Sequence, residues 1–130
     1  MILAPCGNDC SACPRFLATA SGDPARLEAV SELWHRLGWR DRVVTNEEIS
    51  CHGCPPPSTC RHDIVACVSD RRLPTCAGCR DKNACERLDL ALAHTALAAD
   101  ACHALCDAET YAVLVKAFFR KRENLGREAS

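Results

Sequence analysis

Cysteine is the residue type in this chain with the clearest chemistry. Twelve of the 130 residues are Cys. Pairs separated by two residues occur at Cys10/Cys13, Cys51/Cys54 and Cys76/Cys79. A turn of this spacing directs two sulfurs to one point, which suits a tetrahedral metal ion or an iron–sulfur cluster. Such a density of Cys serves either disulfides in an oxidising compartment or metal thiolates in a reducing one, and the repeated spacing favours metal.

Three triplets of sulfurs follow from the spacing. Residues 51–60 read C-H-G-C-P-P-P-S-T-C and residues 76–85 read C-A-G-C-R-D-K-N-A-C, so the pattern C-x-G-C-x5-C occurs twice. Gly53 and Gly78 hold the same place in each turn, where a positive φ would let backbone N–H groups curl towards a thiolate. The N-terminal triplet, Cys6, Cys10 and Cys13, is spaced C-x3-C-x2-C.

The spacing leaves the fourth ligand of each triplet open. If residues 60–67 are all helical, Cys60 and Cys67 lie about 10.5 Å apart along the axis. Sulfurs that share one zinc ion lie only about 4 Å apart. Either Cys60 therefore precedes the helix and joins the turn at 51–54, or Cys67 serves a different metal. His62 is a further candidate ligand because it follows Cys60 by two residues, whereas His52, inside a C-x2-C turn, is expected to face solvent.

The candidate metal ligands are thus Cys6, Cys10, Cys13, Cys51, Cys54, Cys60, His62, Cys67, Cys76, Cys79 and Cys85. Cys102 and Cys106 are spaced i, i+4 and have two interpretations. They could supply two ligands to one site, or they could be buried thiols that pack as small hydrophobic groups. His94, further along the chain, is not expected to be a ligand.

Composition and charge exclude several classes of protein. A net charge of −1 and six aromatic residues argue against a nucleic-acid surface. No apolar run is long enough for a transmembrane helix, and the N-terminus lacks a signal-peptide pattern, so we expect a cytoplasmic protein without a membrane partner. Apolar residues make up 48%, but Ala and Cys account for about half of them. The core is therefore thin, and something else must contribute to the fold.

Helices must position these ligands, because no segment alternates at the period of a strand. Asp23-Pro24 begins a helix that Gly38 closes, Thr45 caps a short turn, and Ser58 or Thr59 caps a helix that reaches about Val68. A longer helix is expected over 83–99, with Leu88, Leu92 and Ala96 facing inward. The last helix starts at Asp107 and carries Arg120, Lys121 and Arg122 in its final turns. The prediction is a single domain over residues 1–130, mainly α, small and irregular, with cysteine-rich loops held by metal and little or no sheet.

The opening run C-G-N-D-C-S-A-C-P at residues 6–14 resembles the start of a bacterial and archaeal family known as domain of unknown function 3795. The two C-x-G-C turns, the segment Asp63–Cys67 and the tail around Phe118 are similar to the family too. Its members are short cysteine-rich proteins, and the resemblance implies zinc binding without an activity. Where family members have Cys about five residues before Cys67, this chain has His62, an exchange that keeps a zinc ligand.

Two functions compete on these grounds. The first is a small cytosolic zinc protein with two ions, or three if every triplet finds a fourth ligand. Its structural sites would each consist of four cysteines, or of three cysteines and a histidine, and it would act as an interaction module for an unidentified protein. The alternative is an iron–sulfur protein in electron transfer or redox sensing. A catalytic zinc with an open position would need a general base, and Asp9 is the nearest carboxylate. Asp9 is equally explained as a turn residue that accepts backbone hydrogen bonds.

Overall fold

The computed structural model describes residues 1–54 and 62–127. Within them the chain is mainly helical and has no strand; Leu3 and Asp9 form an isolated antiparallel bridge. The elements in chain order are η1 (Cys10–Ala12), α1 (Pro14–Ser21), α2 (Pro24–Arg36), α3 (Asn46–Ile49), α4 (Ile64–Asp70), η2 (Cys76–Gly78), η3 (Lys82–Ala84), α5 (Glu86–Leu105), α6 (Ala108–Phe118) and α7 (Lys121–Leu125).

Capping side chains begin three of the helices where the sequence predicted them. Asp23 accepts a hydrogen bond from the Ala25 amide at the start of α2. Thr45 accepts from the Glu48 amide at α3, and Asp107 accepts from the Thr110 amide at α6. Each of these side chains satisfies a donor that the first turn of a helix leaves without a partner.

Other helix boundaries differ from the prediction. The described part of α4 begins at Ile64, and the predicted caps Ser58 and Thr59 lie outside the described residues. Helix α5 runs to Leu105 rather than about Ala99, and Ala96 is exposed where an inward position was expected. Helix α1, which begins at Pro14, was not predicted.

The basic run does not end the last predicted helix. Helix α6 stops at Phe118, and a separate helix α7 begins at Lys121. The break has a packing reason, since the two sides of it reach different apolar cores. Phe118 packs against the first core, whereas Leu125 is buried in the second. One continuous helix would carry the Leu125 side chain along the axis of α6, away from the second core.

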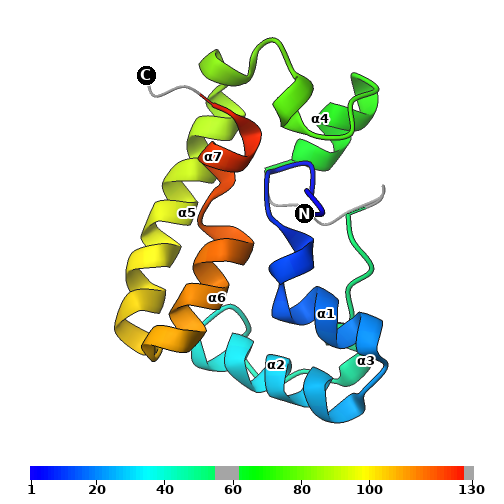
Figure 1. Cartoon of the computed structure of the whole chain (residues 1–130), viewed down its shortest axis with the longest axis vertical. Helices are drawn as coiled ribbons and strands as arrows, with labels where there is room; N and C mark the ends of the chain where they lie inside the picture. The colour runs from blue at the N-terminus through cyan, green and yellow to red at the C-terminus, as the bar shows by residue number, and fades with distance from the viewer. Residues whose placement is uncertain (55–61, 128–130) are drawn as a thin grey trace.

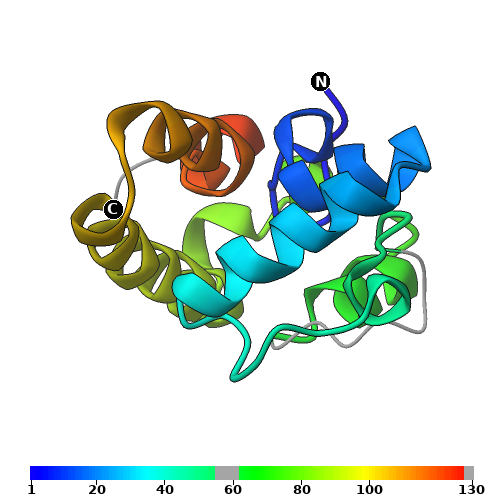
Figure 2. The ribbon, with the colours of Figure 1, turned by 90° about the horizontal axis from the view of Figure 1, so that it is seen from below.

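Two small cores support the fold. The first joins α1, α2, α3, α5 and α6 through buried side chains that include Ala18, Trp34, Ile49, Cys102 and Leu114. The second contains buried residues of α4, η2, α5 and α7, which are Ile64, Val68, Cys76, Leu88, Ala91 and Leu125. Figure 1 shows α5 and α6 side by side on the left and α2 across the bottom of the view. Helices α1 and α3 lie to the right, and α4 lies at the upper right. The view from below shows α2 lying across the molecule (Figure 2).

Candidate metal centre

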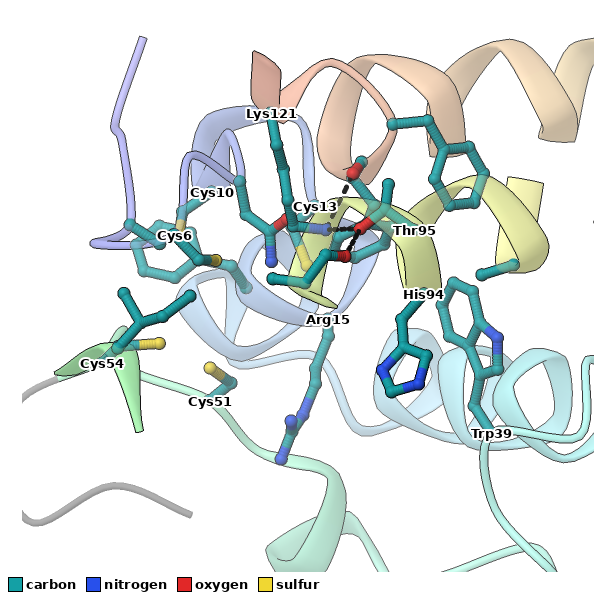
Figure 3. A pocket seen from close by; sticks show the side chains of 18 of the residues that line it. Cys6, Cys10, Cys13, Arg15, Trp39, Cys51, Cys54, His94, Thr95 and Lys121 are labelled. Carbon is teal, nitrogen blue, oxygen red and sulfur yellow. Dashed lines mark hydrogen bonds between the residues drawn. The ribbon is translucent and has the colours of Figure 1, made fainter. Parts of the chain in front are cut away.

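Four thiols from two distant parts of the chain gather at one cavity. Cys10 and Cys13 come from the η1 turn, and Cys51 and Cys54 come from the segment that follows α3. We name these four residues the first thiol group. Figure 3 shows them facing one another, with Cys6 close to Cys10. Two C-x2-C turns from different segments can together present the four ligands of one tetrahedral site.

Helix α1 holds the second half of this group in place. The Arg15 guanidinium donates hydrogen bonds to the backbone carbonyls of Glu48, Ile49 and Ser50 at the end of α3. The Thr19 hydroxyl accepts a hydrogen bond of 2.9 Å from the Cys51 amide. Cys13 is the N-cap of the same helix, so α1 ties Cys51 to Cys13. Nothing in the sequence pattern pointed to Arg15 or Thr19 in this role.

Two thiols of the first group, Cys10 and Cys13, resist ionisation. Burial raises the pKa of the Cys10 thiol from 9.0 to about 11, and the neighbouring Cys54, Cys13, Cys51 and Cys6 contribute to this rise. Burial also raises the pKa of Cys13, although backbone N–H groups of α1 oppose this effect. A bound cation would reverse this balance, because it attracts the thiolate and removes the repulsion between neighbouring sulfurs.

Asp9 supports the turn that carries Cys10. Its carboxylate accepts hydrogen bonds from the Ile2 amide and from the amide and hydroxyl of Ser11, and only 3% of the residue is exposed. The hydrogen bonds, the one from the Ser11 hydroxyl first, lower the Asp9 pKa. The carboxylate is therefore engaged as a turn acceptor, which is the second of the two roles that the sequence allowed.

A second thiol group consists of Cys67, Cys76, Cys79 and Cys85. Cys67 lies on α4, Cys76 and Cys79 bound the η2 turn, and Cys85 is the N-cap of α5. All four line one small void of about 40 Å³. Burial raises the pKa of Cys76 to about 11, with added contributions from the thiols of Cys67, Cys79, Cys85 and Cys6.

Arg71 closes this second group from the solvent side. Its guanidinium lies 3.1 Å from the Cys79 sulfur and donates a 2.7 Å hydrogen bond to the Asp81 carboxylate. This ion pair lowers the Asp81 pKa and raises that of Arg71. A cation beside sulfur favours the thiolate, so Arg71 is suited to a metal-bound Cys79.

The grouping differs from the three triplets that the spacing predicted. The turn at 51–54 joins Cys10 and Cys13, and the turn at 76–79 joins Cys67 and Cys85. The two turns also differ in backbone, since Gly53 has a φ of +106° whereas Gly78 does not have the expected positive φ. Cys67 lies in a different thiol group from Cys51 and Cys54. This agrees with the alternative in which Cys67 serves a different site from the turn at 51–54. Cys60 lies outside the described residues.

Cys6 lies between the two groups. It lines the cavity of the first group and packs against the second core, and it raises the pKa of both Cys10 and Cys76. The chain therefore has a ninth thiol within electrostatic reach of both groups.

The histidines occupy different settings. Nε2 of His62 lies 3.1 Å from Nδ1 of His94, and both rings line the cavity of the first thiol group. The sequence pattern indicated His62 as a candidate ligand but not His94. His94 lines the cavity because α5 forms part of its wall. His52 is exposed, as predicted.

Cys102 and Cys106 belong to the first core. Cys102 is 1% exposed and lies among its buried residues, and Cys106 packs against it. Burial raises the pKa of the Cys102 thiol. These surroundings agree with the second interpretation of the pair, as thiols that pack like small apolar side chains.

The sulfurs of each thiol group are close together, but their spacing is wider than that of ligands around one metal ion. Within residues 1–54 and 62–127, no three His, Cys, Asp or Glu side chains already lie close enough to hold a metal ion. Binding a metal ion would therefore require the sulfurs to move closer together. Chemically, each group can supply four soft ligands, the set that zinc and iron–sulfur clusters take.

Comparison with known protein families gives a match. The model of a family described as "Protein of unknown function (DUF3795)" matches residues 2–90. That range contains both thiol groups and Cys6, and it ends within α5. No curated protein and no solved structure matches the chain. None of the helices in the described part of the chain combines the length and apolar character needed to cross a membrane.

Proposed function

The chain belongs to the DUF3795 family of proteins of unknown function, and from this premise we propose that it is a cytosolic zinc-binding module. Each thiol group would hold one zinc ion in a structural site of four cysteines. The observation that carries the proposal is the gathering of two separate groups of four thiols. Each group joins a C-x2-C turn to cysteines from another segment of the chain.

The electrostatics of both groups support a bound cation. Cys10 and Cys13 of the first group and Cys76 of the second resist ionisation, because burial and the neighbouring thiols raise their pKa values. Zinc coordinates thiolates directly and supplies the missing positive charge. The reducing cytosol keeps such thiols available to metal, which is why we place the protein there.

The small cores support a structural role for the metal. A structural zinc site contributes about 10–16 kcal/mol of apparent binding free energy to folding in small domains. The second core is made of six buried residues, and one of them is the candidate ligand Cys76. A metal ion there would join α4, η2 and α5 where apolar contacts are few.

A protein partner is the second half of the proposal. The outward surface of α5 exposes Leu90, Leu97 and Leu105, which are 61%, 69% and 51% exposed. Large apolar side chains that gather on one exposed helix face favour contact with another protein. The interaction role rests on this face, and the metal role does not depend on it.

Metal content of purified variants tests the metal role. We expect the wild-type protein, purified without air, to be colourless and to hold two zinc ions per chain by mass spectrometry. Cys51→Ser should lose the zinc of the first group only, and Cys76→Ser that of the second only. Cys106→Ser is the matched control and should keep both ions.

Other outcomes of this experiment would contradict the proposal. A brown protein with equal iron and sulfide would make it an iron–sulfur protein. A protein with neither metal, or one in which Cys106→Ser loses as much zinc as Cys51→Ser, would leave no metal role for these groups.

A further inference from the structure

The cavity beside the first thiol group has features of a small-molecule site that metal binding does not explain. Its volume is about 510 Å³, within the range of roughly 300–1,000 Å³ that ligand pockets occupy. One wall carries the thiols. The other wall is built from α2 and the residues after it, α5, α6 and the start of α7. Figure 3 shows Trp39, His94 and Thr95 of this wall on the side away from Cys51 and Cys54.

The other wall is aromatic. Trp34, Trp39 and Phe118 all line the cavity, and each pair of these rings packs edge to face with centroids 4.9 to 5.9 Å apart. Trp34 is buried, while Trp39 and Phe118 are only partly covered. Partly covered rings held rigidly by one another form a preorganised surface for an apolar or aromatic body.

The charged side chains that line the cavity among the described residues are all basic. Arg15, Arg40 and Lys121 line it, and none of the described residues lining it is Asp or Glu, although the chain has 17 acidic residues. Arg15 uses its guanidinium on the end of α3, and Arg40 donates to the Trp39 carbonyl. A zinc ion held by four thiolates would carry a net negative charge, and Arg15, on the thiol side, would offset part of it.

Lys121 is the cation on the aromatic side. Its ammonium donates to the Thr95 hydroxyl at 2.9 Å and to the Phe118 carbonyl at 3.0 Å, which fixes the charge at the cavity wall. The helix break after Phe118 produces this placement, because Lys121 is the first residue of α7.

We propose that this cavity binds a small organic carboxylate with an apolar or aromatic body. The body lies on Trp39 and Phe118, which pack against the buried Trp34, and the carboxylate pairs with Lys121. This inference goes beyond the metal role, because the residues that recognise the ligand include no proposed metal ligand.

Tryptophan fluorescence offers a direct measurement. Trp34 and Trp39 are the only two tryptophans of the chain, and both line the cavity. The probe is phenyllactate, an aromatic hydroxycarboxylate, titrated into the full-length protein as purified. Its neutral amide, of nearly the same shape, is titrated in parallel. We expect the carboxylate to change the fluorescence saturably and to bind about tenfold tighter than the amide, as for a charge-assisted pair.

Two pairs of variants locate the site. Lys121→Met should weaken phenyllactate about tenfold and leave the amide unchanged, whereas Lys116→Met, which removes an exposed lysine of α6, should change neither. Ala98→Leu narrows the cavity from α5 and should weaken both probes. Ala96→Leu places the same side chain on the exposed face of α5 and should weaken neither.

Several results would overturn the proposal. These are equal affinity for the carboxylate and the amide, equal effects of Lys121→Met and Lys116→Met, or no saturable change in the wild-type protein. Zinc content is measured on every sample, so the two proposals are judged separately. Selective phenyllactate binding by a protein without zinc would uphold the cavity and contradict the metal role, and two zinc ions with no binding would do the reverse.

Discussion

Cys10 and Cys76 hold their protons at neutral pH, and this fixes how metal binding must depend on pH. Each thiol has a pKa raised to about 11, first by burial and then by the neighbouring thiols. Zinc takes the thiolate, so binding releases the proton that each thiol carries. Because the metal-free state holds more protons than the bound state below this pKa, affinity rises with pH.

The expected slope is measurable. The apparent zinc affinity should rise about tenfold per pH unit for every proton released, up to four protons per site. Competition with a coloured chelator between about pH 6 and pH 8 measures it, after correction for the chelator's own protonation. Cys106→Ser should give the wild-type slope, since Cys106 lies outside both groups. An affinity that does not change with pH would mean that the ligands are not protonated thiols.

Gly7 shows why the loop between Cys6 and Cys10 contains a glycine. Its φ is +93°, and a Cβ there would lie 2.8 Å from Leu125 Cγ and 3.0 Å from the Lys121 carbonyl oxygen. Helix α7 thus packs directly on the backbone of the thiol-bearing loop. The Asn124 carboxamide adds a 2.9 Å hydrogen bond to the Gly7 carbonyl.

We therefore expect Gly7→Ala to lower the free energy of unfolding by about 2–4 kcal/mol, through backbone strain and overpacking together. Gly22 provides a matched control, because its φ is +68° but nothing lies within 4 Å of a Cβ there. Gly22→Ala should cost only about 1 kcal/mol, from backbone strain alone. Urea unfolding in saturating zinc measures both variants. Equal losses would show that the contact with α7 is loose.

The elements that sequence reasoning found are those with local signals. Helices α2, α3 and α6 begin at Asp23, Thr45 and Asp107, and each side chain caps its own helix. Helix α1 was missed because its N-cap, Cys13, makes no side-chain capping bond and was considered only as a ligand. The break before Lys121 was missed because a basic run also suits the end of one long helix. Only the separation of the two cores explains the break.

The candidate metal site also has one part that the sequence predicted and one part that it did not. The C-x2-C spacing is local, so the sequence identified the ligand pairs. Which pairs combine depends on Arg15 and Thr19, which bring Cys51 to α1 across more than thirty residues. No local pattern carries that information, and the repeat at 51–60 and 76–85 pointed instead to two equivalent triplets.

At the scale of the whole molecule, the two thiol groups relate differently to the two cores. Cys76 is a buried member of the second core, and Cys85 and Cys6 pack against it. The first core includes none of the first thiol group, and its cysteines, Cys102 and Cys106, are not proposed ligands. Removal of metal should therefore disturb the second core directly and the first core only indirectly, through the segments at Cys13 and Cys51.

Hydrogen exchange can resolve this difference along the chain. When zinc is removed by a chelator, we expect the amides of α4, around Val65 and Val68, to lose protection first. Amides of α2, around Val30 and Trp34, should keep theirs longer, because that helix is buried in the first core. Cys76→Ser without chelator should expose α4 in the same way, since it removes only the second metal. If α2 and α4 instead lose protection together, the chain unfolds as one cooperative unit, and both cores depend on the metal.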